Sequence, residues 1–229
     1  MKALAALTAV LLTALVARAD IAVSGEAKLT VVPDIAHVSV GVVTDGKTAA
    51  DALAANNTAM RALFKALEAL GISERDIQTS SFTITPKYET PVSVPEHPLP
   101  PVLVGYTVSN QITVTVRKVE KTGKVVDALV TDGANRVNGI GFGIGDTSKL
   151  MDEVRKLAVA DARHRAELYA EAAGVSVGRV IQISENGVSF PPPRMYSKEE
   201  LAAAGVPLAR GELTVSANVT VVYAIGGQK

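Results

Sequence analysis

Hydrophobic residues in this chain repeat at every second position in some stretches and at every third or fourth position in others, and this alternation constrains the fold most. A repeat of two is typical of strands, and a repeat near 3.6 is typical of helices. The first repeat predicts strands over residues 21–32, 35–44, 77–88, 102–117, 137–146, 178–190 and 211–225. The second repeat predicts helices over residues 48–70, 120–134 and 148–173.

This order of elements predicts an α+β fold, in which a largely antiparallel sheet or sheets pack against two long helices and one shorter helix. The chain of 229 residues is long enough for one large domain or two small ones. It contains no cysteine, so packing alone must stabilise the fold.

Four glycines alternate with larger residues in the fifth predicted strand: Gly139, Gly141, Gly143 and Gly145. Their strict spacing of two differs from a dinucleotide-binding loop, in which the glycines are separated by two and then three positions. They leave one face of the strand without side chains, so a helix or another subunit can approach closely. The next helix carries a stripe of mostly small residues that we expect to dock on this face: Ala158, Ala162, Ala166, Tyr169 and Ala173.

Residues 1–19 have the features of a signal peptide. Lys2 precedes an apolar run, and the small residues Ala17 and Ala19 stand two positions apart, as signal peptidases require. The run is shorter than the roughly 20 apolar residues that a transmembrane helix needs. We therefore predict cleavage of this leader, export to a bacterial periplasm, and a soluble mature domain over residues 20–229 without a transmembrane segment.

The mature chain would carry 21 basic and 23 acidic residues, because cleavage removes Lys2 and Arg18 from the 23 basic residues. This balance argues against nucleic acid, which is bound through clustered basic side chains. The sequence shows no His-Glu-x-x-His motif, no paired cysteines and no carboxylate cluster. It therefore predicts no catalytic, cofactor-binding or metal-ligating residue, and no enzymatic activity.

Two segments rich in proline interrupt the predicted strands. Residues 89–101 contain five prolines and His97, and residues 191–210 begin with three consecutive prolines. In the second segment, Ser197 and Glu200 have the spacing of a capping box for a short helix. Both segments fit stiff surface loops, and they are alternatively contacts for a protein partner or for another subunit.

A set of scattered positions keeps a distinctive order and spacing over nearly the whole mature chain. In the first half these positions are Gly25, Glu26, Pro33, Asp34, Ile35, Ala36, Asn57, Gly71, Ile72, Asp76, Ile77, Thr79, Pro86 and Tyr88. In the second half they are Gly105, Tyr106, Asn110, Gly133, Ala134, Asn135, Gly139, Ile140, Ala158, Asp161, Ala162 and Ala166. With them the chain resembles the SIMPL-domain family, which includes bacterial periplasmic proteins and the outer-membrane immunogenic proteins of Brucella. Ala27 departs from the second glycine often seen in the opening strand of that family.

The resemblance implies an exported α+β protein with no known enzymatic activity, and in some members a large ring-like or channel-like homo-oligomer. Bacterial relatives have been linked to envelope or oxidative stress, and association with the outer membrane is a further expectation. The family has no established catalytic residues, so the resemblance assigns none to this chain.

Two functional hypotheses follow. The first is a periplasmic interaction or scaffolding protein that self-associates through exposed strand edges, the alanine-rich helix or the proline-rich loops. The second is a small-molecule binder or hydrolase that uses polar groups such as Asp34, His37 and Arg136, brought together by folding. A deep pocket with convergent polar groups would favour the second hypothesis, and an extended apolar or edge-strand surface would favour the first.

Overall fold

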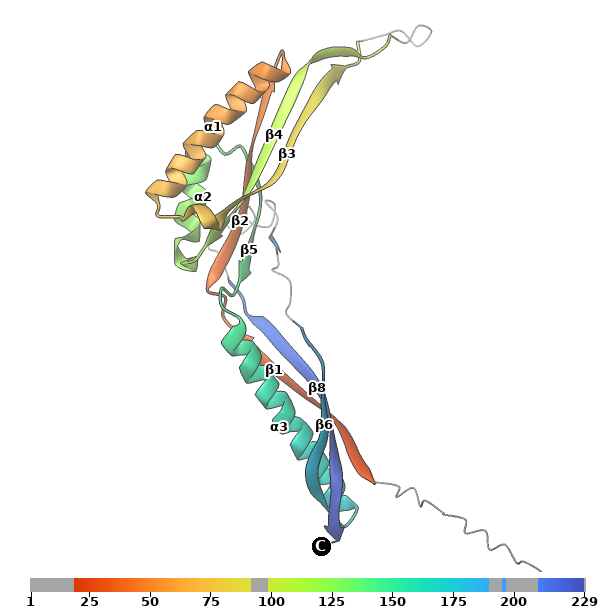
Figure 1. Ribbon diagram of the computed structural model, residues 1–229. Helices are drawn as coiled ribbons and strands as arrows, with labels where there is room; N and C mark the ends of the chain where they lie inside the picture. The colour runs from red at the N-terminus through yellow and green to blue at the C-terminus, as the bar shows by residue number, and fades with distance from the viewer. Residues whose placement is uncertain (1–18, 92–98, 190–194, 197–209, 229) are drawn as a thin grey trace, which may run out of the picture. The chain divides into compact units, whose positions relative to one another are not determined.

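The computed structural model describes residues 19–91, 99–189, 195–196 and 210–228 (Figure 1). The predicted leader up to residue 18, His97 and the capping box at Ser197 lie outside the described residues. Within the described residues the strands form a three-stranded sheet and a five-stranded sheet, both antiparallel. This arrangement confirms the predicted α+β fold.

The chain forms two compact units, which we name after their sheets. The described part of the five-stranded unit comprises residues 29–91, 99–150, 195–196 and 210–215. The described part of the three-stranded unit comprises residues 19–28, 151–189 and 216–228. Neither unit is continuous in sequence, so the three-stranded unit draws its strands from both ends of the described chain.

The five-stranded sheet has the strand order β3, β4, β2, β5, β7. Its strands are β2 (Ile35–Gly46), β3 (Ile77–Glu89), β4 (Val102–Val116), β5 (Arg136–Gly143) and the short β7 (Met195–Tyr196). Its helices are α1 (Ala49–Ala69) and α2 (Thr122–Thr131), with 3₁₀ turns at η1 (Glu74–Asp76) and η2 (Val119–Lys121). Both α-helices cover the same face of the sheet (Figure 1).

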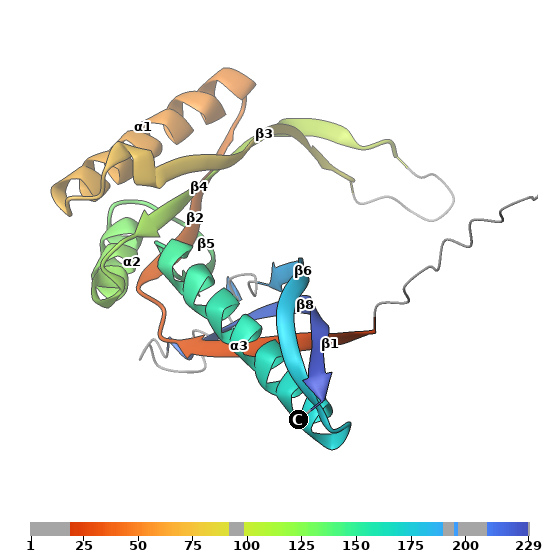
Figure 2. The same cartoon turned by 60° about the horizontal axis from the view of Figure 1, so that its bottom comes forward.

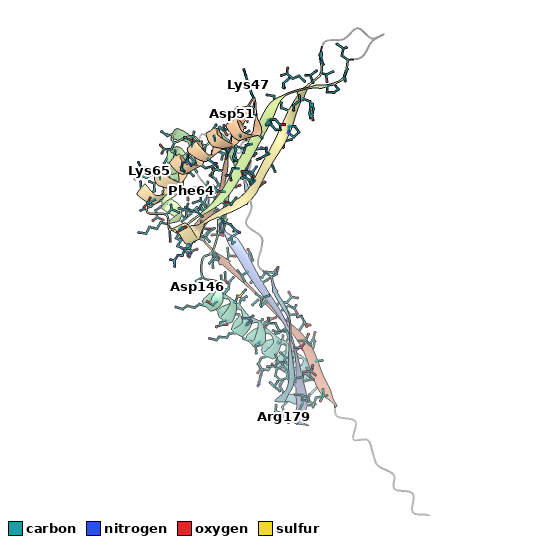
Figure 3. All side chains as sticks on the ribbon, turned by 45° about the horizontal axis from the view of Figure 1, so that its top comes forward. Lys47, Asp51, Phe64, Lys65, Asp146 and Arg179 are labelled. Carbon is teal, nitrogen blue, oxygen red and sulfur yellow. The ribbon has the colours of Figure 1, made fainter. Side chains whose placement is uncertain are left out.

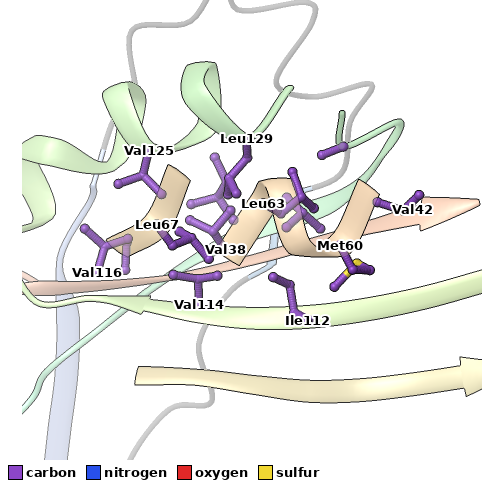
Figure 4. Close-up of a cluster of buried hydrophobic side chains, with 14 of the residues drawn as sticks. Val38, Val42, Met60, Leu63, Leu67, Ile112, Val114, Val116, Val125 and Leu129 are labelled. Carbon is purple, nitrogen blue, oxygen red and sulfur yellow. The ribbon is translucent and has the colours of Figure 1, made fainter. Parts of the chain in front are cut away.

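The core of this unit lies between the helices and the central strand β2. Every second residue of β2 points inward, and the row is buried: Ala36, Val38, Val40 and Val42. From α1, Met60, Leu63 and Leu67 pack against this row (Figure 4). Full burial of an aliphatic side chain contributes about 1.5–3 kcal/mol. The apolar residues that repeat every second position in β2 and those that repeat at helical spacing in α1 are therefore buried in the same core.

The ends of the helices follow local signals in the sequence. Thr48 caps α1, because its side-chain oxygen accepts a hydrogen bond from the backbone N–H of Asp51 at 3.1 Å. Gly71 follows α1 with a φ of 74°, a left-handed conformation that favours glycine. The second helix is shorter than the predicted range 120–134, because Gly133 has a φ of 116° and turns the chain just after α2.

The three-stranded sheet has the order β1 (Asp20–Val31), β8 (Leu213–Gln228), β6 (Val175–Ser189). The helix α3 (Ser148–Ala172) lies along one face of it (Figure 2). Small side chains at every fourth position of α3 are buried: Ala158, Ala162, Ala166 and Ala170. Tyr169 and Ala173 are exposed, contrary to the sequence interpretation, because the buried stripe follows a spacing of four and passes through Ala170 instead.

The alanine stripe docks on a different strand from the one the sequence suggested. A Cβ atom added to Gly25 of β1 would lie 2.1 Å from the backbone oxygen of Ala158 and 2.6 Å from the backbone nitrogen of Ala162. The close approach of helix and strand therefore occurs at β1, inside the three-stranded unit. The expectation that α3 would dock on the glycine-faced strand was wrong.

The glycine-bearing face of β5 points away from α1 and α2. Ile140 and Phe142 alternate with the glycines and point into the core, so the glycines lie on the other face. The strand ends at Gly143, earlier than the predicted range 137–146. The backbone N–H of Gly145 donates to the Asp34 carboxylate at 2.8 Å, so this amide binds a side chain and does not extend the strand.

We expect the Gly25→Ala substitution to lower the free energy of unfolding by about 1–3 kcal/mol, because the new methyl group overlaps the α3 backbone. The matched control is Gly123→Ala in α2, where a Cβ atom meets nothing within 4 Å. At this position alanine should raise the free energy of unfolding by about 0.5–1 kcal/mol, because it favours the helical backbone. Urea unfolding followed by circular dichroism measures both values, and an equal response of the two variants would contradict this packing.

Candidate functional site

Asp34 and His37, two of the polar groups proposed from the sequence, have structural partners. The Asp34 carboxylate accepts a hydrogen bond from the backbone N–H of Gly145. The backbone N–H of Asp34 donates to the Gly143 carbonyl at 3.0 Å. Nδ1 of the half-buried His37 is hydrogen-bonded to the Thr115 hydroxyl at 3.2 Å. Burial lowers the pKa of His37 below its usual value, which favours the neutral ring.

Arg136, the third proposed group, lies apart from the other two. It is exposed at the start of β5 and pairs in register with Gly41 of β2. Gly41 is four residues from His37, which corresponds to about 13 Å along a strand. The fold therefore does not bring Asp34, His37 and Arg136 together. Among the described residues, no group of three or more His, Asp or Glu side chains could hold a metal ion.

Two asparagines replace missing backbone pairing. Asn135 donates to the Val43 carbonyl at 2.7 Å and accepts from its N–H at 2.8 Å, as a neighbouring strand would. Asn56 is fully buried on α1 and donates to the Val42 carbonyl at 3.0 Å. The side-chain oxygens of Asn56 and Asn110 are buried, and neither has a hydrogen-bond partner within the described residues. The asparagines therefore hold α1 and β5 against β2.

Open strand edges occur in both units. In the described part of the chain, no strand pairs with the outer side of β3 or of β6. β6 exposes the aliphatic side chains of Val180, Ile181 and Ile183. β3 exposes Phe82 and Ile84. Unpaired backbone groups on such an edge can bind another strand, and exposed apolar side chains strengthen that tendency.

A groove of about 570 Å³ lies between α1 and β3. It is lined by Phe64, Glu68, Ile72, Glu74, Ile77 and Thr79. Figure 3 shows Phe64 on the C-terminal half of α1, where its side chain is 40% exposed. No sequence signal predicts a binding role for these residues, because the helical repeat marks the buried side of α1 but not the side that borders an open strand.

A pocket of about 310 Å³ at the end of β4 gathers positive charge around one buried carboxylate. Arg75, Arg117, Lys118 and Lys121 all line it, together with Asp76. Arg117 donates to Asp76 through Nε at 2.9 Å and through Nη2 at 2.6 Å. These bonds hold the pKa of Asp76 below its usual range. The pair therefore fixes the start of β3 to the end of β4.

The Asp76 pair predicts a specific pH dependence of stability. A carboxyl group with a depressed folded-state pKa stabilises the protein above its unfolded-state pKa of about 3.9, and this contribution is lost as the pH falls through the folded-state pKa. Asp76→Asn should therefore lower the urea midpoint at pH 7, and the deficit should shrink below about pH 4.

The exposed Asp132, for which the described residues show no ion pair, provides the control. Asp132→Asn should leave the urea midpoint close to that of the wild type at pH 7. A deficit of Asp76→Asn that stays constant from pH 7 down to pH 2.5 would show that the ion pair does not contribute to stability.

The described residues thus form an α+β protein whose polar side chains mainly join its elements, while outer strands such as β3 and β6 each have one unpaired side in the described part of the chain. None of the helices in the described ranges is both long and apolar enough to cross a membrane. The chain belongs to the SIMPL family, described as a protein of unknown function (DUF541), which matches residues 21–223.

Named relatives agree with this family. The chain is 39% identical over 215 residues to the 26 kDa periplasmic immunogenic protein of Brucella melitensis, a match that covers 90% of this chain and 85% of the relative. The protein of the same name from Brucella abortus has the same identity and coverage. The uncharacterized protein YggE of Escherichia coli K12 is 26% identical over 186 residues, which cover 81% of this chain and 73% of YggE.

Proposed function

We propose that this chain is an exported periplasmic interaction or scaffolding protein that self-associates through an open strand edge. The observation that carries the proposal is the edge strand β6 of the three-stranded unit. Of the three contact surfaces expected from the sequence, the alanine stripe of α3 is buried against its own sheet. The proline-rich loops lie largely outside the described residues. The strand edges therefore carry the argument.

The chemistry of β6 suits association with another strand. Residues 180–184 contain neither a charged residue nor a proline, the two residue types that commonly protect an edge. Ile183 is 54% exposed, although isoleucine is among the residues most often buried. A strand from a second copy would pair the backbone of this segment and cover its aliphatic side chains.

The periplasmic location is supported by the names of the Brucella relatives and by the signal-peptide features of residues 1–19. A role in envelope or oxidative stress, and contact with the outer membrane, remain parts of the same proposal. The mature chain has no cysteine and shows no metal-site motif, and its oxidisable sulfur is limited to Met60, which is buried, Met151 and Met195. A role in oxidative stress would therefore be indirect and would act through a partner.

The alternative, a small-molecule binder or hydrolase, receives less support. It needs convergent polar groups that are free to bind a ligand, whereas Asp34 and His37 are engaged in structural hydrogen bonds and Arg136 lies elsewhere on the sheet. Polar groups do converge in the pocket at the end of β4, but there Arg117 is paired with Asp76.

Light scattering coupled to size exclusion, applied to residues 20–229, tests self-association. We expect the wild-type mass to exceed that of one chain, and Ile183→Lys to reduce it, because a buried lysine at a strand–strand contact is strongly unfavourable. Val130→Lys is the control, since Val130 is 51% exposed on α2 in the other unit. Its mass should equal the wild-type mass. A monomeric wild type, or equal masses for Ile183→Lys and the wild type, would refute association through β6.

A further inference from the structure

We infer that the groove between α1 and β3 binds an extended peptide that adds a strand to β3 and carries apolar side chains at alternate positions beside a basic residue. This site lies in the five-stranded unit, whereas the proposed self-association uses β6 of the other unit. The two proposals therefore rest on separate observations.

The edge of β3 is chemically suited to receive a strand. The segment from Ile77 to Thr85 contains no charged residue and no proline, and Pro86 and Lys87 limit it at one end. The outer side of β3 pairs with no strand of the described chain. A peptide added at such an edge gains main-chain hydrogen bonds that do not depend on its sequence.

The side chains of β3 that share a face with α1 form an apolar row. Ile77 and Thr79 pair in register with the buried Val114 and Ile112 of β4. The register then shifts between Thr79 and Ser81. Because of this shift, the next side chain of β3 that faces α1 lies three positions after Thr79 instead of two.

The row continues beyond the shift with Phe82, which pairs with Asn110, and Ile84, which pairs with the buried Val108. Phe82 is 48% exposed and Ile84 is 42% exposed, so α1 leaves both uncovered. A strand added beside β3 would place every second side chain next to this row.

Phe64 and Ile72 form the apolar wall of the groove opposite this row. A side chain of the added strand that points toward α1 would enter the space between that wall and Ile77. The groove thus selects for apolar residues at alternate positions, which is the usual source of specificity in strand addition.

The charge of the groove gives the second element of specificity. Glu68 and Glu74 line it, and neither forms an ion pair within the described residues. The neighbouring basic residues in the sequence, Lys65 and Arg75, do not line this groove. An unneutralised pair of carboxylates beside an apolar groove favours a partner with a positive charge.

Fluorescence anisotropy with labelled peptides tests the inference on the mature chain. The first probe is Lys-Val-Thr-Val-Thr-Val-Thr-Val-Lys, and the second replaces both lysines with glutamate. We expect the first probe to bind roughly tenfold more tightly than the second, with a preference that weakens as salt is added. A third probe with proline in place of the central threonine should not bind, because it cannot pair along β3.

Two variants assign the binding to the groove. Phe64→Ser should weaken binding of the first probe. Val130→Ser, a change at another exposed apolar residue, should leave that affinity unchanged. The double variant Glu68→Lys with Glu74→Lys should reverse the preference between the first two probes. Glu171→Lys, at an exposed glutamate of α3, should leave the preference unchanged. Circular dichroism confirms that each variant is folded.

Equal affinity for the lysine and glutamate probes, binding of the proline probe, or no effect of Phe64→Ser would overturn the inference. A fall in the mass of the Phe64→Ser variant by light scattering would also overturn it, because the groove would then hold a second copy of the chain. The Ile183→Lys measurement is independent of these results, so failure of the peptide site and failure of self-association through β6 can be told apart.

Discussion

The buried row on β2 is the constraint on which the five-stranded unit depends. β2 pairs with β4 on one side and with β5 on the other, and α1 covers its inner face. Its small and β-branched side chains therefore meet protein in every direction, at the density of a close-packed interior. Because the chain has no cysteine, no covalent cross-link supplements this packing. The position of α1 on the sheet follows from how β2 is enclosed.

Much of this could be predicted from the sequence, because the relevant signals are local. The repeat of two in β2, the cap at Thr48 and the glycine after α1 each act within a few residues. Partner choice is not local. The alanine stripe predicts that α3 packs closely against another element of the fold. The residue against which it packs, Gly25, lies more than 130 positions away in the sequence. A periodic pattern identifies the buried face of an element and not the element that covers it.

The same limit applies to the candidate sites. Asp34, His37 and Arg136 were proposed as polar residues beside strands, and only the register of β2 and β5 showed that Arg136 lies apart. The open edges could not be read from residue types either, because a strand of β-branched residues has the same composition in the middle of a sheet and at its edge. The sheet order reveals which strands are open. The two proposed contacts use strands of different units.

The discontinuous make-up of the three-stranded unit has a consequence for how it folds. β1 comes at the start of the described chain and β8 at its end, and the contact between Asn218 and Glu26 spans 192 positions. Contacts between such distant residues slow folding, because closing the long intervening loop costs chain entropy before the contact can stabilise the fold. The five-stranded unit can build most of its core from a nearly continuous stretch, whereas β1 must wait unpaired until the last strand has been made. Until then its backbone stays available to other chains, and the time spent in that state sets the exposure of this protein to misassembly.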